Sequence, residues 1–365
     1  MVAQEKDRTV VADEALGYPI IVAPGVVGCM NEFLLSRSYR DVVVLCDANP
    51  AVRTIAQRLV RRLRPQARLL AFALGERRKR LSTLEVVLDG LTTVGAERTT
   101  LLIGVGGGVA SDLFGFAAAT YMRGTAYAHV ATSLVAMVDA AIGGKTGVDL
   151  AGGKNLAGAF RDPVAVFCDL DALQTLPYRH LREGLAEIVK AAIIEGGDLF
   201  EGLETLAAHP FYRWPWESIV VDAIRIKAAI VRDDRLEAGD RELLNLGHTF
   251  AHAFERAGGY RMSHGAAVAV GLRAAGMLAL RLGRFSEEEH LRVLALLALL
   301  RLPMHAALDV DATLAAMGAD KKVRKGRLRF VLPRAIGDVE HGIVARRATV
   351  RNVLERVRLR PGAAG

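Results

Sequence analysis

Three histidines and one glutamate in the second half of the chain have side chains suited to metal binding. His248 and His252 stand four positions apart in NLGHTFAH, which places both on one face of a helix. His264 follows in SHGAAV, and Glu187 precedes them in GLAEIVK. One carboxylate and two imidazoles satisfy a zinc ion and leave a position open for substrate. Thr249 stands where a zincin metalloprotease has glutamate, so the pair does not indicate a protease. The spacing does not select between the three histidines, and a structural role for each remains open.

A run of glycines in the first half is a candidate phosphate-binding turn. Residues Gly104 to Asp112 read GVGGGVASD, after an expected strand and before an expected helix. Glycines let a ligand approach the backbone, and the helix N-terminus offers free N–H groups to a pyrophosphate. Asp47, in CDAN after another expected strand, is suited to hold an adenosine ribose. Because the spacing departs from GxGxxG, a tight turn that needs positive φ, with Asp47 as a cap, is the alternative.

Cations among glycines are the third candidate feature. Lys145 lies in GGKTG, and Lys154 with Asn155 lies in GGKN. Lysines in such surroundings suit phosphate or carboxylate capture, although surface lysines on flexible loops give the same pattern. Further on, Lys190 lies one helical turn from Glu187. Four polar residues precede His248 in the sequence at spacings that could place them along one groove: Lys227, Glu237, Arg241 and Asn245.

Short apolar runs alternate with helical patterns in the first 170 residues. Strands are expected at 41–45, 69–74, 99–103, 126–130 and 164–167, and helices at 51–63 and 81–91. This alternation predicts a parallel sheet with helices on its faces.

Longer helical patterns predominate after Pro177. They cover 181–194, 218–231, 242–256 and 266–282, and extended character returns only near 328–332. We therefore predict an α/β N-terminal domain with a parallel Rossmann-like sheet at 1–170. A mostly α-helical C-terminal domain that binds metal and substrate is predicted at 171–365.

The composition of the 365 residues is that of a globular protein. Hydrophobic residues make up 52% and charged residues 24%, and the formal net charge is +8. No nucleic-acid motif accompanies the arginine runs, and no apolar run is long enough to cross a bilayer. The three cysteines lack CxxC spacing, which favours a reducing compartment. We therefore expect a soluble, cytoplasmic protein that binds neither nucleic acid nor membrane.

Four ordered blocks resemble the 3-dehydroquinate synthase family of sugar phosphate cyclases. They are GGGVASDLFGFAAATYMRG (106–124), MVDAAIGGKTGVDLAGGKNLAGAF (137–160), LREGLAEIVKAAII (181–194) and LLNLGHTFAHAFE (243–255). The resemblance spans roughly 41–333 and implies a dehydroquinate synthase-like fold, a homodimer, and NAD with zinc or cobalt as cofactors. It departs at Ala131–Thr132–Ser133, where the family often has Pro-Thr-Thr. It also departs at Asp149 and Ala266, where Asn and Glu are common.

The resemblance also assigns roles to individual residues. The implied zinc ligands are Glu187, His248 and His264, and His252 becomes an active-site base or proton relay. The implied NAD contacts are Asp47, Asn49, Glu76, Lys79, Gly106, Gly107, Gly108, Asp112, Thr132, Ser133 and Thr175. The implied substrate contacts are Arg123, Asp139, Lys154, Asn155, Lys227 and the lysines of the late DKK, Lys321 and Lys322. Further substrate contacts, with catalytic roles, are implied at Lys145, Lys190, Glu237, Arg241 and Asn245.

The activity that the resemblance implies is phosphate elimination from 3-deoxy-D-arabino-heptulosonate 7-phosphate, a small anionic sugar phosphate, followed by ring closure. The rival activities are those of a cyclase acting on sedoheptulose 7-phosphate or an amino analogue, and of a metal-dependent polyol dehydrogenase. An inactive binding protein on the same scaffold is a third alternative.

Overall fold

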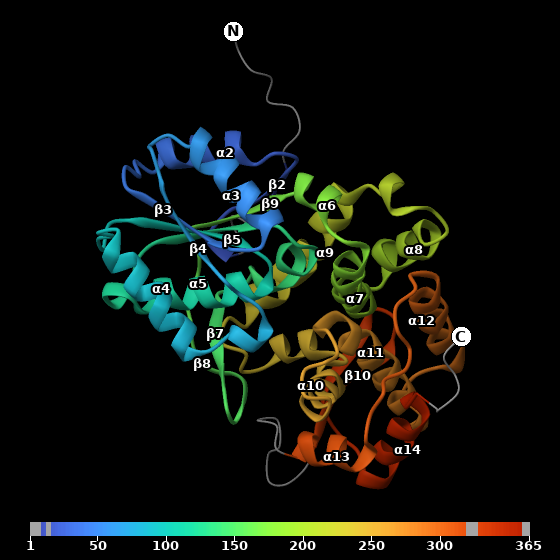
Figure 1. The fold of residues 1–365 in the computed structure, drawn as a ribbon. Coiled ribbons are helices and arrows are strands. Elements are labelled where there is room, and N and C mark those ends of the chain that lie inside the picture. Colours follow the sequence, from blue (N-terminus) through green and yellow to red (C-terminus); the bar gives the residue numbers. More distant parts are fainter. Residues whose placement is uncertain (1–8, 12–15, 319–327, 360–365) are drawn as a thin grey trace. The chain divides into compact units, whose positions relative to one another are not determined.

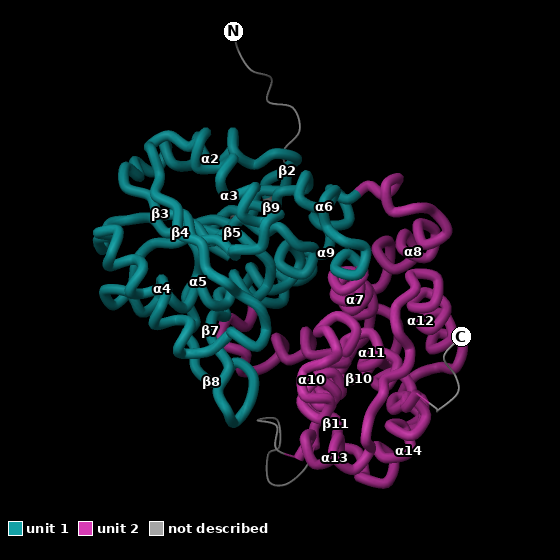
Figure 2. Tube along the Cα trace, in the orientation of Figure 1, with its two compact units in different colours: residues 1–181, 216–232 teal, residues 182–215, 233–365 magenta. Residues whose placement is uncertain are grey.

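The computed structural model describes residues 9–11, 16–318 and 328–359, and the chain forms two compact units. Unit 1 consists of residues 1–181 and 216–232, and unit 2 of residues 182–215 and 233–365 (Figure 2). Unit 1 therefore includes most of a helix, α9 (Trp216–Asp233), that lies well beyond residue 170. The functional division at residue 170 stays a prediction.

A seven-stranded sheet forms the centre of unit 1. Its order is β1-β2-β9-β6-β5-β3-β4, and all neighbours are parallel except β1 and β2. The strands are β1 (Thr9–Val11), β2 (Ile20–Ala23), β3 (Val42–Asp47), β4 (Arg68–Phe72), β5 (Leu101–Gly106), β6 (Tyr127–Ala131) and β9 (Ala165–Asp169). The predicted α/β class with a parallel sheet is confirmed, and the first two strands were not predicted.

Helices cover both faces of this sheet (Figure 1). One core joins α2 (Val27–Ser36) and α3 (Pro50–Arg62) to strand residues such as Val42 and Val44. The other core joins α4 (Leu81–Thr93) and α5 (Gly108–Thr120) to residues such as Val43 and Leu45. Successive side chains of a strand point to opposite faces, so a strand covered on both sides is a continuous apolar run. This explains why VVVL was recognisable as a strand.

A hairpin of unit 1 occupies a segment that the sequence left without regular structure. Strands β7 (Lys145–Leu150) and β8 (Gly153–Phe160) pair antiparallel. The remaining short helices of unit 1 are η1 (Glu76–Arg78), η2 (Tyr121–Arg123), the π-helix η3 (Ala136–Ala140) and α6 (Asp171–Thr175). The hairpin was missed because glycines within its strands and at its turn obscure the strand pattern.

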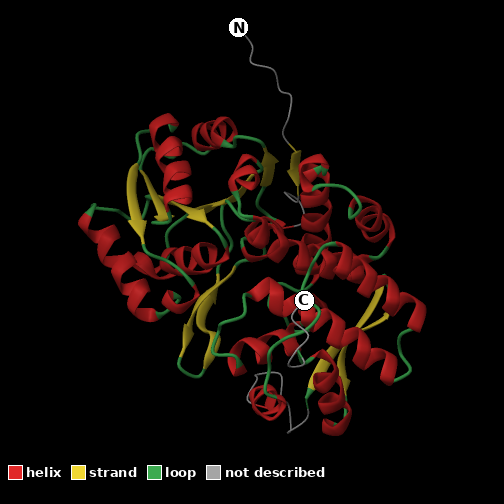
Figure 3. Ribbon diagram, turned by 45° about the vertical axis from the view of Figure 1, so that its right-hand side comes forward, coloured by secondary structure: helices red, strands yellow, loops and turns green. Residues whose placement is uncertain are grey.

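Unit 2 is mostly helical and has one two-stranded sheet, β10–β11, beside its helices (Figure 3). Helix α7 begins in unit 1 and continues into unit 2. The elements are α7 (Tyr178–Glu195), α8 (Gly197–Leu206), η4 (Phe211–Arg213), η5 (Asp240–Asn245), α10 (His248–Ala257), α11 (His264–Arg281), α12 (Glu287–Leu299), α13 (Val310–Gly318), β10 (Arg329–Ala335), β11 (Asp338–Val344) and α14 (Arg347–Val357). No helix in the described part of the chain is long and apolar enough to span a membrane.

The single helix expected over 242–256 is wrong. A 3₁₀ turn, η5, ends at Asn245, and α10 starts only at His248. Between them Gly247 is left-handed, with φ of +77°. A Cβ there would lie 2.9 Å from the backbone nitrogen of Leu272, so only glycine fits the break.

Candidate active site

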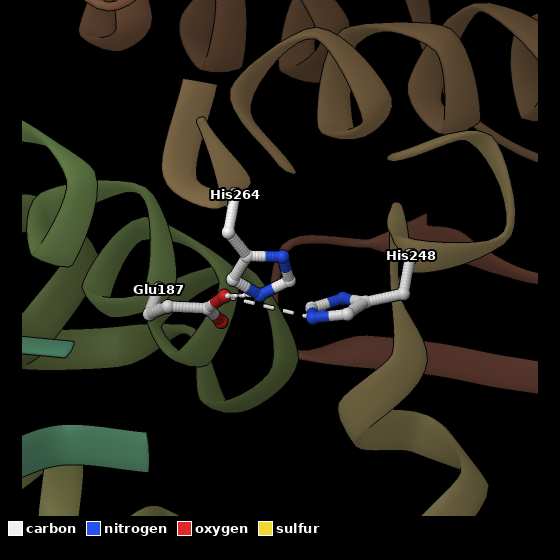
Figure 4. Close-up of side chains that lie close together, drawn as sticks. All are labelled: Glu187, His248 and His264. Carbon is white, nitrogen blue, oxygen red and sulfur yellow. Dashed lines mark ion pairs between the residues drawn. The ribbon is translucent and has the colours of Figure 1, made fainter. Parts of the chain in front are cut away.

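Glu187, His248 and His264 meet in unit 2 (Figure 4). Glu187 comes from α7, and the two histidines are the first residues of α10 and α11. Glu187 Oε1 lies 3.5 Å from His248 Nε2 and 3.2 Å from His264 Nε2. One ligand atom from each residue lies within 4.8 Å of the other two, so the three form a possible metal site.

Glycines at two close contacts position the histidines. A Cβ on Gly265 would lie 2.3 Å from the Cα of Glu183, one helical turn before Glu187. A Cβ on Gly271 would lie 2.3 Å from the carbonyl oxygen of Gly247. The backbone of α11 therefore packs directly on α7 and on the turn before α10. The small residues that follow His264 bring its ring to Glu187.

Buried charges set the electrostatics of the cluster. Burial alone would raise the pKa of Glu187, but Lys190, with Nζ 2.6 Å from Oε2, and His248 hold that pKa well below its usual range. Burial lowers the pKa of His248, whose Nδ1 lies 3.2 Å from the carbonyl oxygen of Leu246. Burial would also lower the pKa of His264, but contacts with two carboxylates raise it to about 10.

The donor set fits a divalent metal. Two ligands at about 2.1 Å from a tetrahedral ion stand about 3.4 Å apart, close to the two nitrogen–oxygen distances from Glu187. Both carboxylate oxygens of Glu187 are buried without a well-formed hydrogen bond, although Lys190 lies beside one of them. Nδ1 of His248 contacts the backbone carbonyl of Leu246. Its other ring nitrogen, Nε2, therefore points toward Glu187, as a metal ligand requires.

His252 lies beside this cluster. It shares α10 with His248, and the ring centroids of the two are 5.5 Å apart. Its ring centroid is 6.3 Å from that of His264. The helical spacing put both histidines of α10 on one face, but the geometry groups His248 and His264 with Glu187. The role of His252 as base or relay stays a prediction.

A loop before α10 carries three of the predicted catalytic residues. Asn245 Nδ2 donates to Glu237 Oε1 at 2.9 Å, and the buried Arg241 guanidinium donates to the carbonyl of Arg235. Asp234 organises the loop, because its carboxylate accepts the backbone N–H groups of Ala238, Gly239 and Arg241 at 2.8, 2.7 and 3.1 Å. Asp234 was not among the residues predicted from the sequence, although an aspartate before a glycine-containing turn is a recognisable signal.

The glycine turn of unit 1 lies where the strand order changes direction. The chain moves from β3 outward to β4, and then returns to the other side of β3 with β5. Asp47 ends β3, and Gly106 ends β5, so both lie at the carboxyl edge where open parallel sheets bind ligands. A Cβ on Gly106 would lie 2.5 Å from that of Ala110, and α5 starts without a side-chain cap. Its first N–H groups thus suit an anion.

The other predicted NAD contacts at this edge have structural tasks as well. Asn49 caps α3 by accepting the N–H of Ala51, and Asp47 Oδ1 accepts the N–H of Asn49 at 3.1 Å. Thr132 follows β6 and is buried, and its N–H donates to the carbonyl of Gly106 at 3.0 Å. A Cβ on Gly107 would lie 3.0 Å from Ser133 Oγ, and Gly108 is the first residue of α5. Thr175 Oγ1 donates to Ala172 within α6.

A buried network joins NAD and substrate candidates in unit 1. Lys79 is 4% exposed, and its Nζ donates to Asp112 and, at 2.6 Å, to Asn155 Oδ1. Lys154 pairs with Glu76. Burial would lower the pKa of Lys79, but Asp112 outweighs it and the pKa is raised.

The hairpin gives a physical account of Asp149, one of the departures from the family. Asp149 Oδ1 accepts the N–H of Asn155 at 2.8 Å, and the N–H of Asp149 donates to the carbonyl of Lys79 at 2.8 Å. Asn155 itself is left-handed, with φ of +51°. A carboxylate or an amide oxygen at position 149 accepts this bond equally well, so the hairpin keeps its shape with either residue.

The remaining substrate candidates divide into three groups. Lys227 Nζ lies 2.6 Å from Asp139 Oδ1, within unit 1. Arg123, left-handed at φ +66°, and Lys145, at the start of β7, are exposed. Lys321 and Lys322 lie outside the described residues.

Fold and site together define a class of protein. A doubly covered parallel sheet with a glycine turn at its switch point is combined with a helical unit that holds a carboxylate and two histidines in metal-binding geometry. Such a combination is typical of enzymes that use both a metal ion and a nucleotide cofactor.

Comparisons with known proteins give the family. The 3-dehydroquinate synthase N-terminal model matches residues 69–183, and the C-terminal model matches 184–323. The 3-dehydroquinate synthase of Gloeobacter violaceus is 41% identical over 352 residues, covering 93% of this chain and 96% of that protein. The chain belongs to the 3-dehydroquinate synthase family, which confirms the resemblance read from the four blocks, and it is an enzyme of this type.

Solved structures agree with the fold. The 2-epi-5-epi-valiolone synthase of Streptomyces hygroscopicus, with NAD⁺ and Zn²⁺ bound, superposes with a TM-score of 0.84 at 29% identity, covering 98% of this chain and 99% of that one. A 2-deoxy-scyllo-inosose synthase, complexed with carbaglucose-6-phosphate, NAD⁺ and Co²⁺, has a TM-score of 0.86 at 24% identity, covering 96% and 100%. The second likeness shows the fold alone.

Proposed function

We propose that this chain converts 3-deoxy-D-arabino-heptulosonate 7-phosphate to 3-dehydroquinate and phosphate, with NAD and zinc or cobalt as cofactors. The observation that carries the proposal is the Glu187–His248–His264 cluster in a chain 41% identical to a 3-dehydroquinate synthase. The 2-epi-5-epi-valiolone synthase relative is less similar, at 29% identity, so the dehydroquinate reaction is preferred over the reaction of that synthase.

The proposed cofactors supply chemistry that side chains lack. When bound, NAD would accept a hydride from carbon C5 of the substrate and return it later, and a metal held by Glu187, His248 and His264 would act as a Lewis acid on the C5 hydroxyl group. The chain's part is to bind and orient. We assign the pyrophosphate to Gly106, Gly107 and Gly108 at the start of α5, and the ribose to Asp47. The remaining predicted contacts from Asn49 to Thr175 would surround the rest of the dinucleotide.

The substrate is an anion with a carboxylate and a phosphate, and the predicted binding residues are rich in cations. We assign phosphate and carboxylate binding to Arg123, Lys145, Lys154, Lys190 and Lys227, with Asp139 and Asn155 orienting hydroxyl groups. Positioned cations stabilise the charge that develops on phosphate as the C–O bond breaks. The Lys227–Asp139 pair holds its lysine in place at a distance of 2.6 Å, so little side-chain entropy is lost on binding.

Proton movement is assigned to unit 2. His252, beside His248, is proposed to take the hydroxyl proton or relay it, since an imidazole titrates near neutral pH. The hydrogen-bonded pair of Glu237 and Asn245, with Arg241, is proposed to orient the substrate's hydroxyl and carboxylate groups.

Product analysis by NMR tests the function. Metal-loaded protein is incubated with 3-deoxy-D-arabino-heptulosonate 7-phosphate and catalytic NAD. We expect 3-dehydroquinate, one phosphate released, and no net NADH. Activity only on sedoheptulose 7-phosphate would assign the chain to another cyclase reaction. Accumulating NADH with a simple polyol would favour a dehydrogenase, and no activity on any of these would favour an inactive scaffold.

We also propose that the enzyme acts as a homodimer in the cytoplasm and has no nucleic-acid partner. Support comes from the family resemblance, the cysteine usage and the lack of nucleic-acid motifs. Sedimentation equilibrium of the purified protein tests the assembly, and a mass of one chain, 39.3 kDa, would contradict it.

A further inference from the structure

A second buried carboxylate lies behind the metal cluster. Glu255 is 1% exposed and lies on α10, seven residues after His248, on the same face of the helix. Its Oε1 is 3.4 Å from His264 Nδ1, while Nε2 of the same ring is 3.2 Å from Glu187 Oε1. The imidazole of His264 therefore stands between two buried carboxylates. Neither the helical spacing nor the family resemblance gave Glu255 a role.

The two nitrogens of His264 are distinguished by this arrangement. An ionised carboxylate only accepts hydrogen bonds, so the nitrogen that faces Glu255 has to carry the proton. In a neutral ring, the lone pair is then on Nε2, which faces Glu187 and the position that a metal would take. A carboxylate behind a ligating histidine also increases the basicity of the ring.

His248 has a different support. Its Nδ1 lies 3.2 Å from the carbonyl oxygen of Leu246, a neutral acceptor two residues away. This backbone contact fixes the orientation of the His248 ring relative to the first turn of α10, and it adds no charge to the site. The two histidines are thus oriented by different groups. His248 is oriented by a neutral backbone carbonyl two residues away, and His264 by the charged side chain of Glu255, nine positions away in the sequence.

We propose that Glu255 is a positioning residue of the metal site: its carboxylate holds the proton on Nδ1 of His264 and so presents Nε2 to a divalent cation. The inference rests on the metal site of the proposed function. Two carboxylates, Glu187 and Glu255, are then buried near one site with Lys190 as the neighbouring cation, and the excess of negative charge attracts a divalent cation. Removal of the charge on Glu255 weakens the attraction for the ion as well as the orientation of the ligand.

The experiment compares Glu255→Gln with the wild-type chain. Glutamine keeps the shape of the side chain but loses its charge. Its amide can place an N–H donor, rather than an oxygen acceptor, against Nδ1 of His264. Zinc affinity is measured at constant pH by competition with a chromophoric chelator, without any turnover assay. We expect affinity to fall by about tenfold to a hundredfold, the usual effect of losing a partner behind a metal ligand. The visible spectrum of the cobalt-loaded protein should change shape, because the orientation of one ligand changes.

Two further variants complete the test. Glu340→Gln, a surface carboxylate of β11 paired with Arg284, is the matched control and should bind zinc like the wild type. Glu255→Asp keeps the charge but shortens the reach, and it should retain part of the affinity. If Glu255→Gln does not fold, Glu255→Asp carries the test, with an expected loss of several-fold and a changed cobalt spectrum.

The outcomes separate this inference from the proposed function. Zinc affinity and a cobalt spectrum within experimental error of the wild type in Glu255→Gln, or in Glu255→Asp if only that variant folds, would overturn the positioning role. Weakened zinc binding in a protein whose wild type does not act on the heptulosonate phosphate would support the positioning role and reject only the proposed reaction. A wild-type protein that binds no divalent metal would overturn both.

Discussion

The two units neutralise their buried charges in different ways. In unit 1 three lysines of the predicted site contact acceptors within the same unit: Lys79 with Asp112 and Asn155, Lys154 with Glu76, and Lys227 with Asp139. In unit 2 the buried Glu187 faces two histidines and one lysine, and neither of its oxygens has a well-formed hydrogen bond.

The difference indicates what each unit is prepared to bind. Charges that are already paired hold their side chains in fixed positions, so that an anionic ligand can be bound by these ordered lysines together with the backbone N–H groups at the start of α5. Glu187 already pairs with Lys190 through Oε2, and its Oε1 lies 3.5 and 3.2 Å from nitrogens of His248 and His264, an arrangement of one carboxylate and two imidazoles that suits a divalent cation. The comparison therefore predicts metal dependence for the unit 2 cluster and a mainly structural cost for breaking the unit 1 pairs.

The largest effect is expected for His248→Ala. Loss of one of three ligands should remove most of the bound zinc and lower kcat by about a thousandfold or more, because Lewis-acid stabilisation is worth several kcal/mol. Metal analysis and steady-state kinetics measure the two losses together. The control is His341→Ala, since His341 also contacts two carboxylates, Asp240 and Glu242, but lies outside the cluster. Normal zinc content and normal rate in His248→Ala would end the ligand assignment.

Asp112→Ala probes the paired charges of unit 1. It removes the carboxylate hydrogen-bonded to the buried Lys79 ammonium and leaves Asn155 as its hydrogen-bond acceptor, with Glu76 and Asp149 acting through their charges, and the free energy of unfolding should fall by about 3 kcal/mol. Urea titration measures this loss. Asp311→Ala is the matched control, because the Asp311–Arg351 pair is exposed to solvent and should contribute little to the free energy of unfolding. Equal losses in the two variants would remove the distinction between a buried pair and a surface pair.

Lys145→Ala tests whether the exposed lysine of the hairpin handles phosphate. A charged hydrogen bond contributes about 1.5–3 kcal/mol, so the KM for the heptulosonate phosphate should rise by about tenfold to a hundredfold. NAD affinity, measured by titration calorimetry, should not change. Arg98→Ala removes an equal charge from an exposed position before β5 and serves as control. Unchanged kinetics in Lys145→Ala would make it a surface lysine.

The smallest effect concerns a buried histidine of unit 1 that has no predicted site role. Burial lowers the pKa of His129 on β6 to about 4 from 6.5, so the unfolded chain binds more protons than the folded one between these values. The stabilisation is present above pH 6.5 and is lost as the pH falls toward 4. Between pH 7 and pH 5, the free energy of unfolding should therefore fall by about 1–2 kcal/mol less in His129→Asn than in the wild type. Urea titrations at several pH values measure both slopes, and parallel slopes would contradict the prediction.

Much of unit 1 was predictable because the central strands of its large sheet, such as β3, β5, β6 and β9, are buried on both faces and form apolar runs in the sequence. The first strand pair was missed, although IIVA at Ile20–Ala23 carries the same signal. The hairpin of Lys145–Phe160 was missed for a physical reason: its strands alternate with glycines that permit close backbone contact. A Cβ on Gly158, for example, would lie 2.1 Å from the carbonyl oxygen of Thr146. Such contacts between chain segments leave no periodic pattern.

The sequence by itself determined the donor types of the site, the glycine turn after β5 and the helical face shared by His248 and His252, because these depend on residue identity and local spacing. Local spacing could not decide which histidines meet Glu187; the family resemblance implied His248 and His264, and the tertiary structure brings these two to the carboxylate. That choice depends on Gly247, Gly265 and Gly271, which let α11 approach α7 and the start of α10. The contact of Glu255 with His264 was likewise decided there. Distances between helices depend on the packing of backbones that are far apart in the chain, and no local spacing encodes them.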